Sequence, residues 1–287
     1  MKKQIIAAAT LLTVGLFSGC GGGSDSAMTN QNSAGKSVIA GSVADGYLVD
    51  ATVFLDKNKN YQLDPDETFT TTKGDGSYTL NIDATDLDSN GKLKYPVVAL
   101  AIAGKTYDLD DQTVGQPIKR LSNSYLLSMH AVSVTPSASG DVTGSVKNFI
   151  SPISTQIREM MESGTYSTVE AAIEALRSKL GMPSTTNMMT NYIANSNSSM
   201  HTAARNMASL MGGQVAQVMQ GNKLDVNRYR GMMGTIFSNI SSVKGSGSGA
   251  QTAMSNLRGN MMIDLDNIMP GQPFRNMSTA FRGGMMR

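Results

Sequence analysis

The sequence predicts an N-terminal antiparallel β-sandwich followed by a methionine-rich α-helical region. Short β-branched or alternating runs, separated by Gly, Asp, Asn and Pro, fill residues 37–135. Apolar residues at helical spacing fill residues 147–287. Composition changes between them: 18 of 21 methionines lie at or after Met160, and residues 20–146 carry a net charge of −6 against +6 for residues 147–287. This asymmetry predicts two domains, joined by a linker at 136–146.

The first nineteen residues have the pattern of an export signal. Lys2 and Lys3 precede a short apolar run, and small residues lead to Cys20, the single cysteine of the chain. The apolar run is too short to span a bilayer. The segment resembles a bacterial lipoprotein signal peptide, which implies cleavage before Cys20 and acylation of its sulfur and its amine, anchoring the protein in a membrane. A plain secretory signal with an incidental cysteine is the alternative.

The resemblance also implies an address and a spacer. Gly21 follows the cysteine, which favours the outer membrane if the host is Gram-negative, with the protein facing the periplasm or the cell surface. Residues 20–36 are rich in Gly, Ser and Asn, so we expect a flexible tether between the lipid and the folded part.

The sandwich is predicted from seven short runs, spaced as in antiparallel β proteins. No helical pattern of about 15 residues interrupts them, which argues against a parallel α/β sheet. The predicted strands are Ser37–Val43, Thr52–Leu55, Phe69–Thr72, Tyr78–Ile82, Val97–Ala103, Thr106–Leu109 and Tyr125–Val134.

The helical region contains one helix with clear start and stop signals. Residues 167–170 form a capping box, S-T-V-E, and Gly181 with Pro183 ends the apolar stripe that follows. Further helices are predicted at 199–220, 224–243 and 250–268. Their apolar faces must be buried, either by packing on one another or by a protein partner.

Residues 56–67, DKNKNYQLDPDE, place oxygen-bearing side chains at alternate positions of a twelve-residue loop. Calcium takes six to eight oxygen ligands, and position 7 of such a loop needs only its carbonyl. The predicted calcium ligands are Asp56, Asn58, Asn60, Gln62, Asp64 and Glu67. Tyr61 stands at position 6, where an EF-hand loop has glycine for a sharp turn, and a non-glycine residue takes a positive φ only at a cost.

A polar hairpin turn rich in Asp and Asn is the alternative to a calcium site, since these residues favour turns. Zinc or copper is not expected in this loop, because it offers neither His nor Cys.

The stretch GSVADGYLVDATVFLDKNKNYQLDPDETFTTTKGDGSYTL resembles the Cna-B, SdrD B-like and carboxypeptidase-regulatory-like β-sandwiches of bacterial surface proteins. The resemblance rests on Gly41–Gly46, Ala51–Phe54, Asp56–Glu67 and Thr71–Tyr78. It implies a prealbumin-like sandwich with structural calcium, used as a stalk, spacer or adhesive module. Residues 149–157, FISPISTQI, resemble the turn that follows such sandwiches in large secreted proteins.

The sequence offers little material for catalysis. It has two histidines, no G-x-S-x-G, no phosphate-binding glycine motif, and basic residues too dispersed for a nucleic-acid face, so neither nucleotide nor nucleic acid is expected. We therefore expect a non-enzymatic, lipid-anchored surface module, structural or adhesive, or an accessory subunit of a surface assembly.

The first alternative is a periplasmic copper-handling lipoprotein, because thioethers bind Cu(I). Its candidate ligands are the methionine pairs 188–189, 232–233, 261–262 and 285–286, with Met200-His201. An exported hydrolase has the least support. Methionine that fills a helical core explains the same composition.

Overall fold

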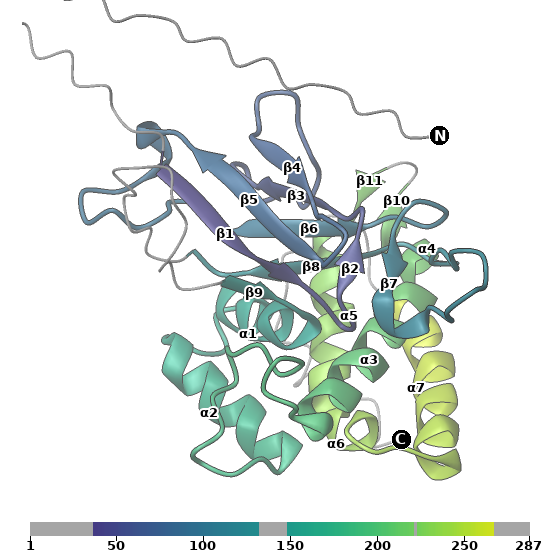
Figure 1. The fold of residues 1–287 in the computed structure, drawn as a ribbon. Coiled ribbons are helices and arrows are strands. Elements are labelled where there is room, and N and C mark those ends of the chain that lie inside the picture. Colours follow the sequence, from purple (N-terminus) through teal and green to yellow (C-terminus); the bar gives the residue numbers. More distant parts are fainter. Residues whose placement is uncertain (1–36, 132–147, 221–222, 267–287) are drawn as a thin grey trace, which may run out of the picture. The chain divides into compact units, whose positions relative to one another are not determined.

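The computed structural model describes residues 37–131, 148–220 and 223–266, in which strands precede most of the helices (Figure 1). The strands are β1 (Ser37–Val43), β2 (Leu48–Val49), β3 (Thr52–Leu55), β4 (Phe69–Thr71), β5 (Ser77–Ile82), β6 (Val97–Ala101), β7 (Tyr107–Asp108), β8 (Tyr125–Met129), β9 (Asn148–Ile150), β10 (Met219–Gln220) and β11 (Lys223–Leu224). The α-helices are α1 (Pro152–Glu162), α2 (Val169–Leu180), α3 (Ser198–Gly213), α4 (Val215–Val218), α5 (Val226–Ser238), α6 (Ile240–Val243) and α7 (Ser248–Asp266). Two 3-10 turns, η1 (Ala84–Asp86) and η2 (Leu109–Asp111), complete the elements. The protein is therefore a mixed α and β fold.

The larger sheet has the order β4-β3-β6-β8, and all its pairs are antiparallel. Every residue of β3 and of β8 is buried, so neither strand shows the alternation of a sheet with one wet face. Contacts with β5 and with helices α1 and α3 account for this burial. Strands β3 and β8 thus lie inside the molecule, with helices against β8, whereas the edge strand β4 is largely exposed.

The smaller sheet has the order β5-β1-β9, and β9 pairs with β1 in parallel. Parallel pairing was not predicted, because the sequence analysis expected antiparallel strands and placed none after residue 135. A Cβ on Gly41 would lie 1.9 Å from the carbonyl oxygen of Asn148. Glycine at this position is therefore what lets β9 approach β1.

Helix α1 follows β9 directly, within the region expected to be helical, but no helix was predicted at this place because residues 149–157 resemble a turn. Ser151 caps the helix: its side chain accepts from the Ser154 N–H, the Ser154 hydroxyl accepts from the Ser151 N–H, and Pro152 starts the first turn. The Ser154 hydroxyl also donates to the carbonyl of Ser128 in β8, 2.8 Å away. The cap thus fixes α1 against the sheet as well as starting it.

The two segments that differ in composition share one hydrophobic core in the part of the chain described. This core contains side chains from β1, β3, β6 and β8 together with side chains from α1, α3 and α5. The apolar faces of the helices were expected to pack on one another or on a partner. They do pack on one another, and α1 and α3 also pack on β8. The predicted linker, 136–146, lies outside the described residues.

The predicted helices agree with the structure in place more than in length. Helix α2 ends at Gly181, which takes φ +64° as expected for a C-cap glycine, although Thr168 rather than Ser167 provides the N-cap. The helix predicted at 199–220 divides into α3 and α4 beyond Gly212 and Gly213, and the one predicted at 224–243 divides at Asn239.

Candidate functional site

The loop of residues 56–67 connects β3 to β4, so the strand context predicted for it is confirmed. Asp56 follows β3 and is completely buried. Its Oδ1 accepts a hydrogen bond from the Asn60 N–H at 3.0 Å, and its Oδ2 accepts one from the Tyr61 N–H at 3.3 Å. The loop is therefore wrapped around the side chain at its first position.

Asparagine side chains hold the middle of the loop. Asn58 Oδ1 accepts from the Asn60 N–H at 3.1 Å, and Asn60 Oδ1 accepts from the Gln62 N–H at 2.7 Å. Both amide nitrogens donate to Asp64 Oδ2, at 2.7 and 2.8 Å. The structure thus brings three of the predicted ligands, Asn58, Asn60 and Asp64, into direct contact. Gln62 contacts this set through its main-chain N–H, which donates to Asn60.

Glu67 closes the loop at its other end. Its Oε1 accepts from the Lys57 N–H at 2.6 Å and its Oε2 accepts from the Asp64 N–H at 3.0 Å. Burial raises the pKa of Glu67, and these two backbone bonds oppose the rise. Both carboxylate oxygens are thus bonded to main-chain N–H groups of the loop.

The chemistry of this donor set suits a hard cation. It contains carboxylate, amide and carbonyl oxygens and no nitrogen or sulfur ligand. Within the described ranges, no three His, Cys, Asp or Glu side chains are grouped so as to hold a metal ion. The loop is closed by hydrogen bonds among the ligands, so a cation would have to replace the amide contacts to Asp64.

Tyr61 takes the positive φ predicted for position 6, at +61°. Its side chain is 1% exposed, and its hydroxyl donates to Glu159 Oε1 on α1 at 2.5 Å. The ring centroid lies 5.1 Å from that of Tyr229 on α5. Burial of the ring offsets the backbone strain. A tyrosine therefore stands at this turn because it attaches the loop to two helices.

Arg158 on α1 lies beneath the loop with a 1% exposed side chain. Its Nη2 is 3.5 Å from Asp56 Oδ2, and its Cζ is 4.4 Å from the Tyr61 ring centroid. Its Nε and Nη1 have no hydrogen-bond partner among the described residues. Burial raises the pKa of Asp56, and the Arg158 charge opposes that rise. The first loop position is thus tied to α1 by a buried ion pair.

Three further ion pairs join the loop, α1 and α5. Lys59 Nζ lies 3.3 Å from Glu162 Oε1 on α1. Arg230 on α5 lies 3.5 Å from Glu159 and 3.6 Å from Glu162. Loop, α1 and α5 therefore meet in one charged network around Tyr61.

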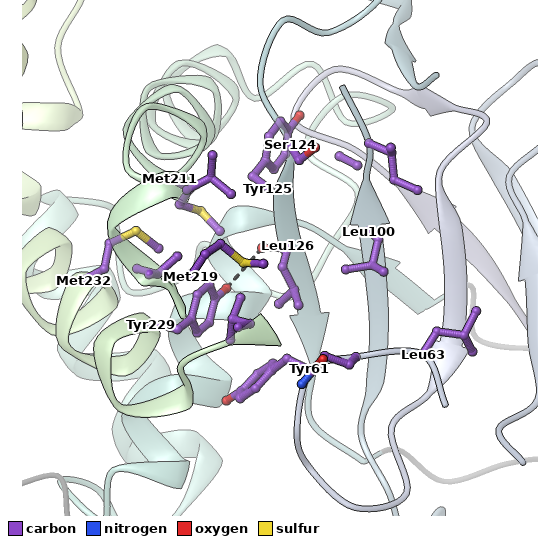
Figure 2. Close-up of a pocket in the computed structure, with 16 residues that line it drawn as sticks. Tyr61, Leu63, Leu100, Ser124, Tyr125, Leu126, Met211, Met219, Tyr229 and Met232 are labelled. Atoms are coloured by element: carbon purple, nitrogen blue, oxygen red, sulfur yellow. Dashed lines mark hydrogen bonds between the residues drawn. The ribbon is translucent and has the colours of Figure 1, made fainter. Parts of the chain in front are cut away.

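Beside the loop lies an apolar cavity of about 500 Å³, shown in Figure 2. Leu63 enters it from the loop, Leu100 and Leu126 from the sheet, and Met211 and Met232 from the helices. The Tyr229 hydroxyl donates to the Leu126 carbonyl at 3.1 Å, so it offers no free donor to the cavity. These walls suit an apolar group.

Several methionines of the described helices are buried in the core. Met200, Met207 and Met211 share the buried face of α3, and Met232 and Met233 are buried on α5. The interpretation as core packing is confirmed for these five residues. The pair 285–286 lies outside the described residues.

Sequence reasoning missed Arg158 and Glu159, the partners of Asp56 and Tyr61. The polar N-cap pattern of residues 151–154 could have revealed their helix, but no local signal indicates which loop that helix contacts.

The predicted lipidation site, Cys20, lies outside the described residues. Among the described residues, no helix is long and apolar enough to cross a membrane.

Comparison with known proteins found no match to the chain: no family model, no curated protein and no solved structure matches it.

Proposed function

We propose that this chain is a non-enzymatic, lipid-anchored protein of the cell envelope, with structural calcium in the loop 56–67. Calcium stiffens the loop, and the loop holds helices α1 and α5 to the sheet. The protein serves as a structural or adhesive surface module, or as an accessory subunit of a surface assembly. In a Gram-negative host the lipid would hold it in the outer membrane, facing the periplasm or the cell surface.

One observation supports this proposal most strongly. The predicted ligands converge within a single loop, and the same loop carries Tyr61 and Asp56, which contact Glu159 and Arg158 on α1. A cation that orders the ligands therefore also orders the contact between sheet and helices. The same proposal includes the resemblance to Cna-B and carboxypeptidase-regulatory-like sandwiches. In it, the sheets β5-β1-β9 and β4-β3-β6-β8 correspond to the two layers of the sandwich.

The proposal is tested by thermal unfolding of the chain from residue 21 onward, in EDTA and in millimolar calcium. Binding to the folded state adds about 2.7 kcal/mol when calcium is 100 times its dissociation constant, which raises Tm by several degrees. Asp64→Asn and Glu67→Gln should abolish the rise. Asp66→Asn, an exposed carboxylate in the same loop that is not a predicted ligand, is the matched control and should keep it.

Asp56→Ala is unsuitable for this purpose. Removing Asp56 leaves Arg158 buried without its partner, which costs about 3–5 kcal/mol with or without calcium. If calcium leaves Tm unchanged in the unsubstituted chain, the loop is a polar turn and the calcium proposal fails.

A further inference from the structure

A second cavity, of about 530 Å³, is polar where the first is apolar. Its walls come from the loop after β1, from β7 and β8, and from helices α3 and α7. The polar and charged side chains that line it include Asp45, Asp108, Tyr125, Arg205, Ser209 and Arg258. The loop 56–67 contributes none of the residues that line it.

Asp45 is 7% exposed and lies against the Tyr125 hydroxyl, which is 3.0 Å from both of its carboxyl oxygens. A phenol has one proton and can donate to only one of them. A proton on Asp45 satisfies the second contact. Burial and the neighbouring charge of Asp108 raise the pKa of Asp45 to about 8, in agreement with that geometry.

Asp108 is 3% exposed and is not fully paired. Its Oδ1 accepts from the Asp110 N–H at 2.9 Å, but its Oδ2 lies 4.0 Å from Arg205 Nη2, beyond hydrogen-bond distance. Arg205 instead bonds Asp111 at 2.5 Å. A Cβ on Gly46 would lie 1.9 Å from Asp108 Oδ1, so glycine beside Asp45 is what admits the second carboxyl.

Arg258 from α7 offers the opposite charge. Its Nη2 donates to the Ser209 hydroxyl at 2.6 Å, and its Nε has no hydrogen-bond partner in the described part of the chain. Gly212 and Gly213 line the same wall, and a Cβ on Gly213 would lie 3.3 Å from Arg258 Nε. The absence of side chains at these two positions leaves the cavity open beside the guanidinium.

We propose that this cavity binds a small zwitterion of the α-amino acid class. The ligand's ammonium group bonds Asp45 and Asp108, and its carboxylate bonds Arg258. Ionised Asp108 attracts a cation, and an ammonium group bound beside Asp45 favours release of the Asp45 proton. The unpartnered Nε–H of Arg258 matches a carboxylate. A ligand with only one of these charges would leave either the carboxyls or the guanidinium without a partner.

The test is isothermal titration calorimetry of the chain from residue 21 onward against the twenty free amino acids. For the tightest binder, the N-acetyl and carboxamide derivatives are titrated in parallel. Each derivative removes one of the two charges, so each should weaken binding by about tenfold or more. These comparisons need no substitution and do not depend on the folding of a variant.

Substitutions locate the site. Asp45→Asn and Arg258→Gln should each weaken binding by about tenfold or more, and Arg258→Lys should restore part of the loss. Lys73→Gln, exposed in the turn between β4 and β5, is the control and should bind as the unsubstituted chain does. Absence of heat with every amino acid would overturn the proposal. Equal binding of the charge-deleted derivatives, or unchanged affinity in both variants, would also overturn it.

Discussion

Tyr61 combines a left-handed backbone with a fully buried ring, so two opposing contributions to stability meet in one residue. Tyr61→Gly removes the strain, worth about 1 kcal/mol, but loses the packing of a large aromatic side chain, worth about 3–5 kcal/mol. We expect Tyr61→Gly to lower the free energy of unfolding by about 2–4 kcal/mol, measured by urea denaturation.

Lys59 provides the matched control, because it also has a positive φ, +60°, while its side chain is exposed. Lys59→Gly loses only a surface ion pair and should change stability by less than about 1 kcal/mol. A Tyr61→Gly variant as stable as the unsubstituted chain would contradict the role of Tyr61 as the attachment of the loop.

The raised pKa of Asp45 predicts that the free energy of unfolding depends on pH. Its pKa is raised from 3.8 to about 8, so between these values the folded state holds a proton that the unfolded state has lost. Stability from this group is complete below pH 3.8 and falls as pH rises toward 8, by about 1.4 kcal/mol per pH unit. Asp108, Tyr125, Tyr192 and Arg205 are the titratable and charged groups that act on it.

The measurement compares free energies of unfolding of the unsubstituted chain and Asp45→Asn from about pH 5 to pH 8, the window between the two pKa values. The amide of the variant cannot ionise, so the difference between the two proteins should shift in favour of the variant as pH rises. Curves that stay parallel would show that Asp45 is ionised throughout this range.

The contacts of a residue were predictable from the sequence where its partners lie close to it in the chain. The predicted calcium ligands fall within twelve residues, so their proximity in one loop follows from spacing alone. The pairs Asp56–Arg158 and Tyr61–Glu159 join residues about a hundred positions apart. Nothing local indicates such contacts, because they depend on where α1 packs.

At the scale of elements, α1 is the clearest test of local signals. Its N-cap residue, Ser151, satisfies the helix start, so Ser151→Ala should lower the free energy of unfolding by about 1 kcal/mol. Ser178, exposed on α2, is the control: Ser178→Ala should be neutral or slightly stabilising, because alanine has the higher helix propensity. Equal effects of both substitutions on the urea midpoint would contradict the capping role.

Element ends followed the capping residues where these were unambiguous. Gly181 ended α2 as predicted, since glycine readily takes a left-handed conformation. The divisions after α3 and α5 were not predicted, because the apolar pattern continues across them. Strand β9 has only three residues and depends on the edge of β1, so its own sequence carries too little pattern to reveal it.

At the scale of the whole molecule, the shared core predicts that strands and helices unfold together. Residues 37–146 alone would expose the face of β8 that α1 and α3 cover, and would lack β9. We expect the chain from residue 21 onward to unfold in one cooperative transition, with coincident far-ultraviolet and tyrosine signals. We expect the fragment 37–146 to lack a cooperative transition. Two separate transitions in the full chain would instead indicate two independent domains.

The presence of both strands and helices was predictable from the order of their patterns, but the shared core was not. Composition differs between the two segments, and that difference favoured two domains. Apolar faces identify what must be buried without identifying what buries it. Here β8 of the larger sheet contacts α1 and α3, which belong to the segment that composition assigned to a second domain.

Calcium bound in the loop 56–67 is proposed to stabilise the attachment of α1 to the sheet. Hydrogen exchange, measured by mass spectrometry in EDTA and in calcium, tests this effect most directly. We expect slower exchange in residues 56–67 and in α1 when calcium is present, with no change in the turn at residues 88–92. We also expect loss of the effect in Glu67→Gln and its retention in Asp66→Asn. Identical exchange of the loop and of α1 with and without calcium would contradict a structural role for calcium.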